Sequence, residues 1–373
     1  MKYKLLSTVF VFSFLSQTIT AQDHKMLTNS RLILGTYKER TASVSSGDID
    51  GDGDVDILVA NGRHWPGQNR IFFNNGRGIF TVETNLGTQK STTYATELAD
   101  LDGDGDLDIA VGNDMAPNYI FLNDGKGVFT KSTSFGEDYA STRNLTLSDI
   151  DSDGDIDILI INRGMPNQIC LNDGKGTFTK TISFGSKKDS TIDVEVADID
   201  NDNDLDLILA NRDSQPNYVY LNDGKLNFTE KIPFGTGKDN TRSVSIVDLN
   251  KDGFLDIITA NINEPNVIYW GNKNRTFTKS LTFDTELMNS FAITTADIDA
   301  DNDLDIIVGN AQNPNMIFYN SENGKKWTRK LLSNEKFLTY DIIATDLSND
   351  GFIDIVEANS DEINRYYINR IKK

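Results

Sequence analysis

Seven short acidic segments place oxygen-bearing side chains at a spacing suited to metal binding. Loops 1 to 7, in chain order, begin at Asp48, Asp100, Asp149, Asp198, Asp248, Asp297 and Asp346. Oxygen side chains stand at positions 1, 3, 5 and 9 of each loop, and position 7 can offer its backbone carbonyl. Calcium takes roughly six to eight oxygen ligands, which a bidentate carboxylate or a water would complete. The predicted ligands, loop by loop, are Asp48, Asp50, Asp52, Asp54 and Asp56; Asp100, Asp102, Asp104, Asp106 and Asp108; Asp149, Asp151, Asp153, Asp155 and Asp157; Asp198, Asp200, Asp202, Asp204 and Asp206; Asp248, Asn250, Asp252, Phe254 and Asp256; Asp297, Asp299, Asp301, Asp303 and Asp305; Asp346, Ser348, Asp350, Phe352 and Asp354.

The residue at position 6 supports the interpretation of these segments as tight ligand loops. It is glycine in five loops and asparagine in the other two, Asn203 and Asn302. These are the residues that best tolerate a left-handed backbone. We therefore expect up to seven Ca²⁺ ions, one for each loop. Loop 7 is the weakest candidate because Ser348 replaces a carboxylate at position 3.

Other metal sites fit the pattern less well. A helical calcium hand requires glutamate at position 12, where these loops carry Val59, Val111 and Ile160. Zinc and copper favour histidine and cysteine, and the chain has two histidines and one cysteine. Magnesium stays open as an alternative, although flexible cages made only of protein ligands suit calcium better.

The negative charge of the chain is concentrated in these loops. The formal net charge is −20, and 31 of the 56 acidic residues lie inside the seven loops. Seven divalent cations would offset 14 charges, so −20 + 14 leaves −6. A nucleic-acid partner is not expected, because such proteins present a basic face.

The loops repeat at a period that predicts a closed ring of similar units. Successive loops begin 52, 49, 49, 50, 49 and 49 residues apart. The pattern of each unit predicts four short strands. In the second unit these are residues 96–99, 107–111 and 119–122 and a strand that begins at Phe129. The hairpin turn Asn123-Asp124-Gly125 precedes the fourth strand. Four antiparallel strands at this period predict an all-β fold, a seven-bladed β-propeller.

The two ends of the chain predict how the ring closes. Residues 32–35 resemble a fourth strand that has no unit of its own, and the last unit ends after its third strand at residues 365–368. Pairing these segments would remove two exposed sheet edges. The N-terminal strand should therefore complete the last blade, and residues 22–373 should form a single propeller.

The first 21 residues resemble an export signal. Lys2 and Lys4 precede an apolar run over residues 5–15, and Ala21 offers a small residue for cleavage. No other stretch approaches the roughly 20 apolar residues of a transmembrane helix. We expect residues 1–21 to be a signal peptide and the protein to be secreted, periplasmic or on the cell surface, as a monomer.

The repeats resemble those of the FG-GAP/VCBS-type family, as found in the propeller of integrin α subunits. The resemblance rests on the Asp-x-Asp-x-Asp-Gly-x-x-Asp loops, on their period and on the pairs Phe135-Gly136, Phe184-Gly185 and Phe234-Gly235. The Gly-Ala-Pro part of the family pattern is poorly kept, and Asn113-Asp114-Met115-Ala116-Pro117 is its nearest form. Membership implies the fold and calcium. It does not imply one function, because the family includes adhesion modules, carbohydrate binders and some enzymes.

Residues that differ between the repeats indicate a ligand face opposite the acidic loops. The first unit has an insertion that carries His64, the only histidine outside the N-terminal tail. The predicted ligand-binding residues, in this insertion, in its sister loops and at the starts of the first strands, are Arg63, His64, Trp65, Tyr94, Arg143, Arg163, Arg212, Arg242 and Tyr340.

Aromatic rings and arginines in this arrangement favour a glycan or an extracellular protein as the ligand of a binding or adhesion module. A carbohydrate-active enzyme, for example a polysaccharide lyase with its site on the same face, is the alternative. It would use His64 or Tyr94 for proton transfer and an arginine to neutralise a uronate. No catalytic residue is assigned from the sequence.

Overall fold

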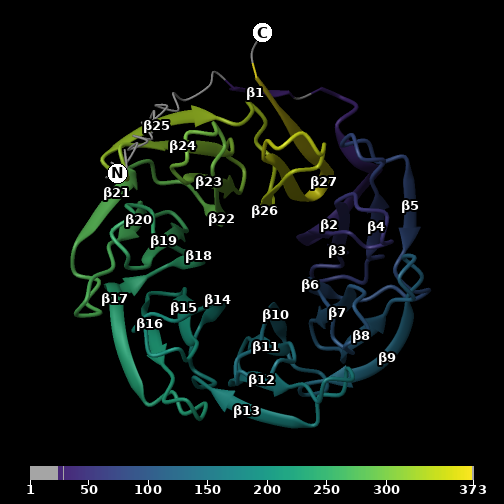
Figure 1. Ribbon diagram of the computed structural model, residues 1–373, viewed down its shortest axis with the longest axis horizontal. Coiled ribbons are helices and arrows are strands. Elements are labelled where there is room, and N and C mark those ends of the chain that lie inside the picture. The colour runs from purple at the N-terminus through teal and green to yellow at the C-terminus, as the bar shows by residue number, and fades with distance from the viewer. Residues whose placement is uncertain (1–23, 28, 372–373) are drawn as a thin grey trace, which may run out of the picture.

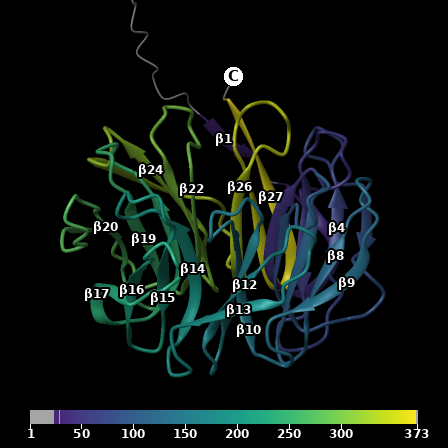
Figure 2. The same ribbon diagram turned by 60° about the horizontal axis from the view of Figure 1, so that its bottom comes forward.

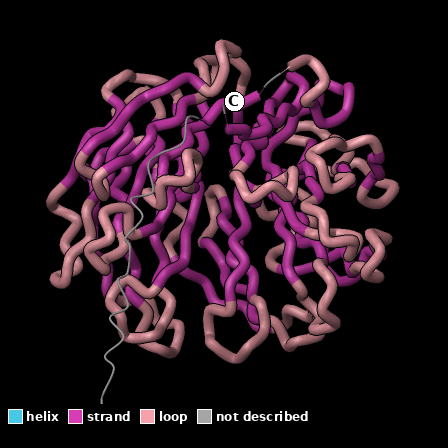
Figure 3. Tube along the Cα trace, turned by 45° about the horizontal axis from the view of Figure 1, so that its top comes forward, coloured by secondary structure: helices cyan, strands magenta, loops and turns pink. Residues whose placement is uncertain are grey.

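The computed structural model describes residues 24–27 and 29–371, which form a ring of β-strands around a central axis (Figure 1). The expected signal peptide, residues 1–21, lies outside the described residues. Figure 3 shows strands, loops and turns and no helical segment in the described chain. In this part of the chain, no helix has the length and apolar character needed to cross a membrane.

Each blade is an antiparallel sheet whose strands follow one another outward from the axis. The innermost strands are β2 (Ile33–Gly47), β6 (Thr93–Ala99), β10 (Thr142–Ser148), β14 (Thr191–Ala197), β18 (Thr241–Val247), β22 (Ser290–Ala296) and β26 (Thr339–Thr345). The second strands are β3 (Asp56–Asn61), β7 (Asp108–Asn113), β11 (Asp157–Asn162), β15 (Asp206–Asn211), β19 (Asp256–Asn261), β23 (Asp305–Asn310) and the first part of β27 (Asp354–Ile371). The third strands are β4 (Arg70–Phe73), β8 (Asn118–Leu122), β12 (Asn167–Leu171), β16 (Gln215–Leu221), β20 (Asn266–Tyr269), β24 (Met316–Ser321) and the second part of β27. The outermost strands are β5 (Val82–Asn85), β9 (Thr130–Phe135), β13 (Lys180–Phe184), β17 (Glu230–Asp239), β21 (Ser280–Asp284), β25 (Lys326–Leu331) and, in the last blade, β1 (His24–Leu27) with the start of β2.

The hydrophobic core lies between the blades. All six residues of β3, β7, β11, β15, β19 and β23 are buried, because both faces of these strands pack against a neighbouring blade. The described residues form seven apolar clusters, each made by two adjacent blades. Figure 2 shows the blades standing side by side, with β9, β13 and β17 on the outside. The predicted seven-bladed propeller is confirmed.

The ring closes as the sequence predicts, with an addition. In the start of β2, Ile33 pairs with Arg365 and Leu34 with Asn364 of β27. The additional strand β1 pairs with the end of β27, with Leu27 opposite Ile368. β2 then continues inward and pairs with β3, so one strand belongs to both the last and the first blade.

Buried polar side chains tie each blade to the next. The second strand of each blade ends in an asparagine, whose side-chain amide donates a hydrogen bond to the backbone of the following loop. Asn113 Nδ2, for example, donates to Pro117 O at 2.7 Å. A second asparagine, at the start of the third strand, reaches the neighbouring blade. Asn118 Nδ2 donates to Thr142 Oγ1 at 3.2 Å, and Asn364 Nδ2 donates to Thr41 Oγ1 at 3.0 Å across the closure. These bonds satisfy polar groups that would otherwise be buried without partners.

Leu34 provides a test of ring closure. Its side chain is 2% exposed and packs with Phe72, Tyr366 and Ile368 of the first and last blades. Leu34→Ala should lower the free energy of unfolding by about 2–5 kcal/mol, because the cavity spans the closure. Removing the chain through Gly35 should expose the edge of β27 and cause aggregation or a large loss of stability.

Ile79→Ala, at a side chain that is 46% exposed, is the matched control and should change stability little. Denaturant unfolding measures both variants. An equal free energy of unfolding for Leu34→Ala and Ile79→Ala would show that closure does not depend on this strand. A truncated chain that stays monomeric with an unchanged melting temperature would show the same.

Candidate metal loops and ligand face

Each acidic loop joins the innermost strand to the second strand of its blade, and its backbone has the conformation that the sequence predicts. Position 6 has a φ of 89° at Gly53 and of 74° and 72° at Asn203 and Asn302. Position 2 is an aliphatic anchor packed into the core, as at Ile49 and Leu347, which are 1% and 0% exposed. The loops are thus fixed at both ends by strands and in the middle by a buried side chain.

Carboxylate oxygens from positions 1, 3 and 9 converge in five of the loops. In each of these groups the three ligand atoms lie within 4.8 Å of one another. The groups are Asp48, Asp50 and Asp56; Asp100, Asp102 and Asp108; Asp149, Asp151 and Asp157; Asp198, Asp200 and Asp206; Asp297, Asp299 and Asp305. Loops 5 and 7 have Asn250 and Ser348 at position 3, so they offer fewer carboxylates there.

The aspartate at position 9 also holds the loop to its blade. Asp56 accepts one hydrogen bond from the Ile49 N–H at 3.0 Å and another from the Asn74 N–H at 2.8 Å. The same pair of bonds recurs in all seven loops. Burial raises the pKa of these carboxyl groups, against the effect of the N–H donors, to about 6 at Asp56, Asp108 and Asp206, to about 7 at Asp157, Asp256 and Asp354, and to about 8 at Asp305.

The loops have spare acceptor atoms for a cation. Oδ1 of Asp50 and Oδ1 of Asp200, both at position 3, are buried without a hydrogen-bond partner. Burial and the charge of Asp52 raise the pKa of Asp50. A buried carboxylate oxygen without a donor is expensive. A hard cation with oxygen ligands removes that penalty, so the residues fit calcium.

Side chains at positions 5 and 7 have other contacts. At position 5, Asp52 Oδ1 accepts a hydrogen bond from the Asp54 N–H at 2.9 Å. At position 7, the Asp54 side chain lies under the hairpin turn of its own blade, where a Cβ on Gly76 would stand 2.7 Å from Oδ1. The carbonyl of position 7 therefore remains the group that this position can offer to a cation, as the sequence suggests.

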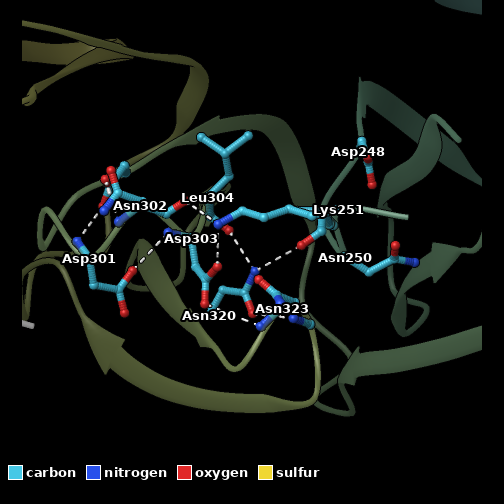
Figure 4. A network of polar contacts seen from close by, with 12 residues as sticks. Asp248, Asn250, Lys251, Asp301, Asn302, Asp303, Leu304, Asn320 and Asn323 are labelled. Carbon is cyan, nitrogen blue, oxygen red and sulfur yellow. Dashed lines mark hydrogen bonds and ion pairs between the residues drawn. The ribbon is translucent and has the colours of Figure 1, made fainter. Parts of the chain in front are cut away.

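Basic residues contact carboxylates of loops 6 and 7 to which the sequence alone does not connect them. Lys251, at position 4 of loop 5, extends to loop 6, where its Nζ lies 2.8 Å from Asp303 Oδ1 and 2.7 Å from Asn302 O (Figure 4). Burial works against ionisation of Asp303, but the Lys251 ammonium lowers the pKa of that carboxyl. In loop 7, Arg370 contacts both Asp350 and Ser348.

The predicted ligand face lies at the other end of the innermost strands. Tyr94, Arg143, Arg242 and Tyr340 stand six residues before the first aspartate of their loops. At about 3.3 Å per residue, this separates them from the loops by roughly 20 Å along the strand. They line a central cavity of about 500 Å³ bounded by innermost strands of all seven blades.

One half of this face is built around Tyr340. Arg63 Nη1 donates to Tyr340 Oη at 2.8 Å, and the guanidinium lies over the tyrosine ring, 4.2 Å from its centroid. Ser360 Oγ holds the other side of the Arg63 guanidinium at 3.1 Å. Arg242 lies 5.6 Å from the centroid of Phe291 and 5.9 Å from that of Tyr340.

The other half is built around Tyr94. Its Oη lies 2.8 Å from His64 Nδ1, and Arg143 lies over the tyrosine ring, 4.2 Å from its centroid. Burial, aided by the charges of Arg63 and Arg143, lowers the pKa of His64, and burial raises the pKa of Tyr94. Arg143 is also paired with Asp114 at 2.9 Å. The predicted histidine thus has a tyrosine partner 30 residues away.

Three predicted residues lie outside this network. Trp65 is 65% exposed, with the guanidinium of Arg40 6.0 Å from its ring centroid. Arg163 is exposed, and Arg212 pairs with its neighbour Asp213 at 3.3 Å. Arg163 and Arg212 are therefore available on the surface rather than around the cavity.

The cavity also contains four acidic residues that the sequence analysis missed, namely Glu97, Asp193, Glu195 and Asp341. Asp193 accepts hydrogen bonds from Asn144 Nδ2 and from the Val244 N–H, and Asp341 accepts one from the Val44 N–H. Burial raises the pKa of Asp341 to about 6. Burial and the charge of Asp193 raise the pKa of Glu195. In the sequence, each of these residues lies three or five places before the first aspartate of an acidic loop, but only the closed ring brings the four together in one cavity.

Comparison with known proteins identifies the repeat. The sequence profile of the FG-GAP-like repeat matches residues 48–111, 100–160, 149–209, 198–259, 248–308 and 297–357. No curated protein matches the chain. Two similar crystal structures are of BBS1N in complex with ARL6DN, soaked with lead and with mercury, with TM-scores of 0.60 and 0.65 and identities of 11% and 12%. Each alignment covers 95% of this chain and 98% of the solved chain, and at such low sequence identities the similarity concerns the fold alone.

Glu195 provides a test of the charge balance in the cavity. Its folded-state pKa is raised above the unfolded value, so protons bind more tightly to the folded chain. The resulting penalty is absent below the ordinary glutamate pKa, grows as the pH rises from that value to the raised pKa, and is constant above it. Glu195→Gln should therefore be more stable than the natural chain by about 2 kcal/mol at about pH 8, and by much less at about pH 5.

Denaturant unfolding at both pH values measures the difference. Glu230→Gln, at an exposed glutamate of β17, removes the same charge outside the cavity and serves as control. A gain for Glu195→Gln that is independent of pH would contradict the assigned charge penalty.

Proposed function

The chain belongs to the family of FG-GAP-like repeat proteins, and on that premise we propose that it is an exported, calcium-loaded propeller that binds a glycan or a protein through the face opposite its acidic loops. The fold of this family suggests a module for ligand binding or protein interaction. The observation that carries the proposal is the division of five of the seven innermost strands between a carboxylate loop at one end and an aromatic or arginine side chain at the other, namely Tyr94, Arg143, Arg242, Phe291 and Tyr340.

Calcium is supported by the charge and geometry of the loops. Three carboxylates within 4.8 Å repel one another strongly when ionised. Their burial raises the pKa at position 9, which is the response expected of a carboxylate without a cation. Calcium would let these groups ionise and would give Oδ1 of Asp50 a partner. The ion would serve the fold, with no part in chemistry.

A ligand on the opposite face is supported by the kinds of side chain gathered there. Arginines already lie over the rings of Tyr94 and Tyr340, which adds positive charge to this face, while Arg163 offers a guanidinium that can bind a carboxylate in bidentate fashion. Trp65 is 65% exposed at the edge of this face, so its ring is accessible for stacking on a ligand. BBS1N was crystallised in complex with ARL6DN, so a propeller of this architecture can carry a protein partner.

Export is proposed from the sequence of the first 21 residues. Lys2 and Lys4, the apolar run after them and Ala21 have the order of a signal peptide. A calcium-loaded propeller is consistent with an extracellular or periplasmic location, where modules with weak calcium sites operate.

A polysaccharide lyase is the second candidate, because His64 has a tyrosine partner at 2.8 Å. A lowered pKa keeps His64 neutral, so it could remove the proton next to a uronate carboxylate, and the Tyr94 hydroxyl could protonate the leaving oxygen. The bond to that oxygen breaks as the proton leaves, which gives an unsaturated product. Against this candidate, Arg143, the nearest group to neutralise the uronate, is already paired with Asp114 at 2.9 Å.

Removal of calcium should destabilise the protein. Each ion that binds only the folded chain adds about 2.7 kcal/mol when calcium is a hundredfold above its Kd. Chelation should therefore lower the melting temperature markedly, and calcium should restore it better than equal magnesium. Equal melting curves in calcium and in chelator would exclude a structural calcium role.

Trp65 and Arg163 test the ligand face. Trp65→Ala and Arg163→Ala should abolish binding on an array of glycans and in assays with candidate protein partners, because both side chains are available on the surface. Calcium content and melting temperature should stay nearly unchanged, since neither residue belongs to the core.

His64→Ala separates the two functions. Assays for unsaturated products on acidic polysaccharides would detect a lyase. Turnover by the natural chain that disappears in His64→Ala would replace the binding function with the enzymatic one.

A further inference from the structure

The turn between the third and fourth strands of one blade lies against position 3 of the acidic loop in the preceding blade. Its last residue is glycine where it faces loops 1, 2 and 5. A Cβ on Gly127 would stand 3.4 Å from Asp50 Cβ, one on Gly176 3.6 Å from Asp102 Cβ, and one on Gly324 3.4 Å from Asn250 Cβ. All three glycines have a positive φ, between 69° and 78°. The left-handed backbone at this position favours glycine, although Leu226 adopts it with a φ of 60° in the equivalent turn of the fourth blade.

In the fifth blade an arginine occupies this glycine position. Arg275 has a φ of 56°, which side chains other than glycine, asparagine and aspartate seldom adopt. Its guanidinium crosses to the fourth blade, where Nη1 lies 2.7 Å from Asp200 Oδ2. Asp200 is position 3 of loop 4, one of the three carboxylates that converge there. The arginine side chain, starting from this turn, thereby puts a fixed positive charge on that carboxylate.

We propose that Arg275 is a resident cation that takes over part of the charge neutralisation in loop 4, so that this loop binds calcium more weakly than loops 1, 2 and 3. The inference rests on the proposed calcium function. A divalent ion entering loop 4 must displace the guanidinium from Asp200 Oδ2 or accept that oxygen as a shared ligand, and the two positive charges repel each other. In return, loop 4 keeps its shape without calcium, since one of its carboxylates has a partner already.

Lys251 shows that a basic residue near a loop does not by itself have this effect. Its ammonium contacts Asp303 and the carbonyl of Asn302, at positions 7 and 6 of loop 6 (Figure 4). The converging carboxylates of that loop are at positions 1, 3 and 9. Lys251 thus joins two loops without contacting the three converging carboxylates, whereas Arg275 contacts one of them.

Calcium titration of the full chain tests the proposal. Arg275→Gln keeps a polar side chain, although a shorter one, and removes its charge, and Arg275→Lys keeps the charge. Arg77→Gln is the matched control, because Arg77 is an exposed residue of the equivalent turn in the first blade and the net charge changes equally. Equilibrium dialysis over a range of free calcium gives the number of ions bound, and thermal unfolding in chelator gives the stability of the metal-free chain.

Arg275→Gln should bind one more calcium ion per chain at concentrations where the natural chain leaves a site empty, with about tenfold higher affinity at that site. It should melt at a lower temperature in chelator and recover in calcium. Arg275→Lys should lie close to the natural chain, and Arg77→Gln should match it. If Arg275→Gln does not fold, Arg275→Gly, which installs the residue of the sister turns, gives the same readout.

If Arg275→Gln shows the same calcium-binding isotherm as the natural chain, or if Arg77→Gln changes calcium binding as much as Arg275→Gln does, the inference is overturned while the proposed calcium binding stands. A natural chain that binds no calcium would overturn the proposed function and this inference together.

Discussion

The propeller depends on one buried carboxylate that is repeated seven times. The aspartate at position 9 accepts the N–H of position 2 and the N–H of the turn after the third strand, as Asp56 does with Ile49 and Asn74. One side chain therefore fixes the acidic loop, the second strand and the hairpin of a blade relative to one another. The turn asparagine extends this tie to the preceding blade, where Asn74 Nδ2 donates to Leu347 O at 2.7 Å. Because that bond joins the first and last blades, the same device also supports closure.

The charge that this device brings into the fold explains the rest of the loop architecture. A buried aspartate with a raised pKa favours the folded state only when it is protonated or has a cation nearby. The loops meet this requirement with different groups: carboxylates arranged for an ion converge in loops 1, 2, 3, 4 and 6, and basic side chains contact carboxylates of loops 4, 6 and 7. Arg275, Lys251 and Arg370 each neutralise a loop carboxylate with a charge that belongs to the chain. The seven loops are alike in backbone and unlike in electrostatics.

The contacts between side chains on the face opposite the acidic loops depend on ring closure rather than on the repeated sequence pattern. Tyr340 in the last blade meets Arg63 in the first, 277 residues away, and His64 then meets Tyr94 in the second. The insertion in the first blade is thereby held between its two neighbours. The acidic residues of the cavity lie below these cations, and Asp193 and Asp341 bond backbone N–H groups of adjacent blades. The side chains around the cavity therefore contact one another, whereas Trp65 and Arg163 are exposed.

The sequence determined what depends on local spacing. Loop period, ligand positions, the left-handed residue at position 6 and the alternation of four strands are set by neighbours within about 50 residues, so they can be read in order along the chain. Closure of the ring could also be predicted, because each end of the chain lacked the strand that the other end supplied. Strand β1 was not predicted, because no repeat contains an equivalent strand.

The tertiary structure alone decided which polar residues meet. The sequence assigned Arg143, Arg163 and Arg212 to the same predicted ligand face, yet Arg143 lines the cavity and the other two lie outside it. Glu97 and Glu195 became one acidic group only when their blades were placed around the axis. Arg275 and Asp200 stand 75 residues apart, and nothing in either repeat announces their ion pair. Such contacts depend on the rotation of one blade against the next, which is fixed by packing in the core and not by any local pattern.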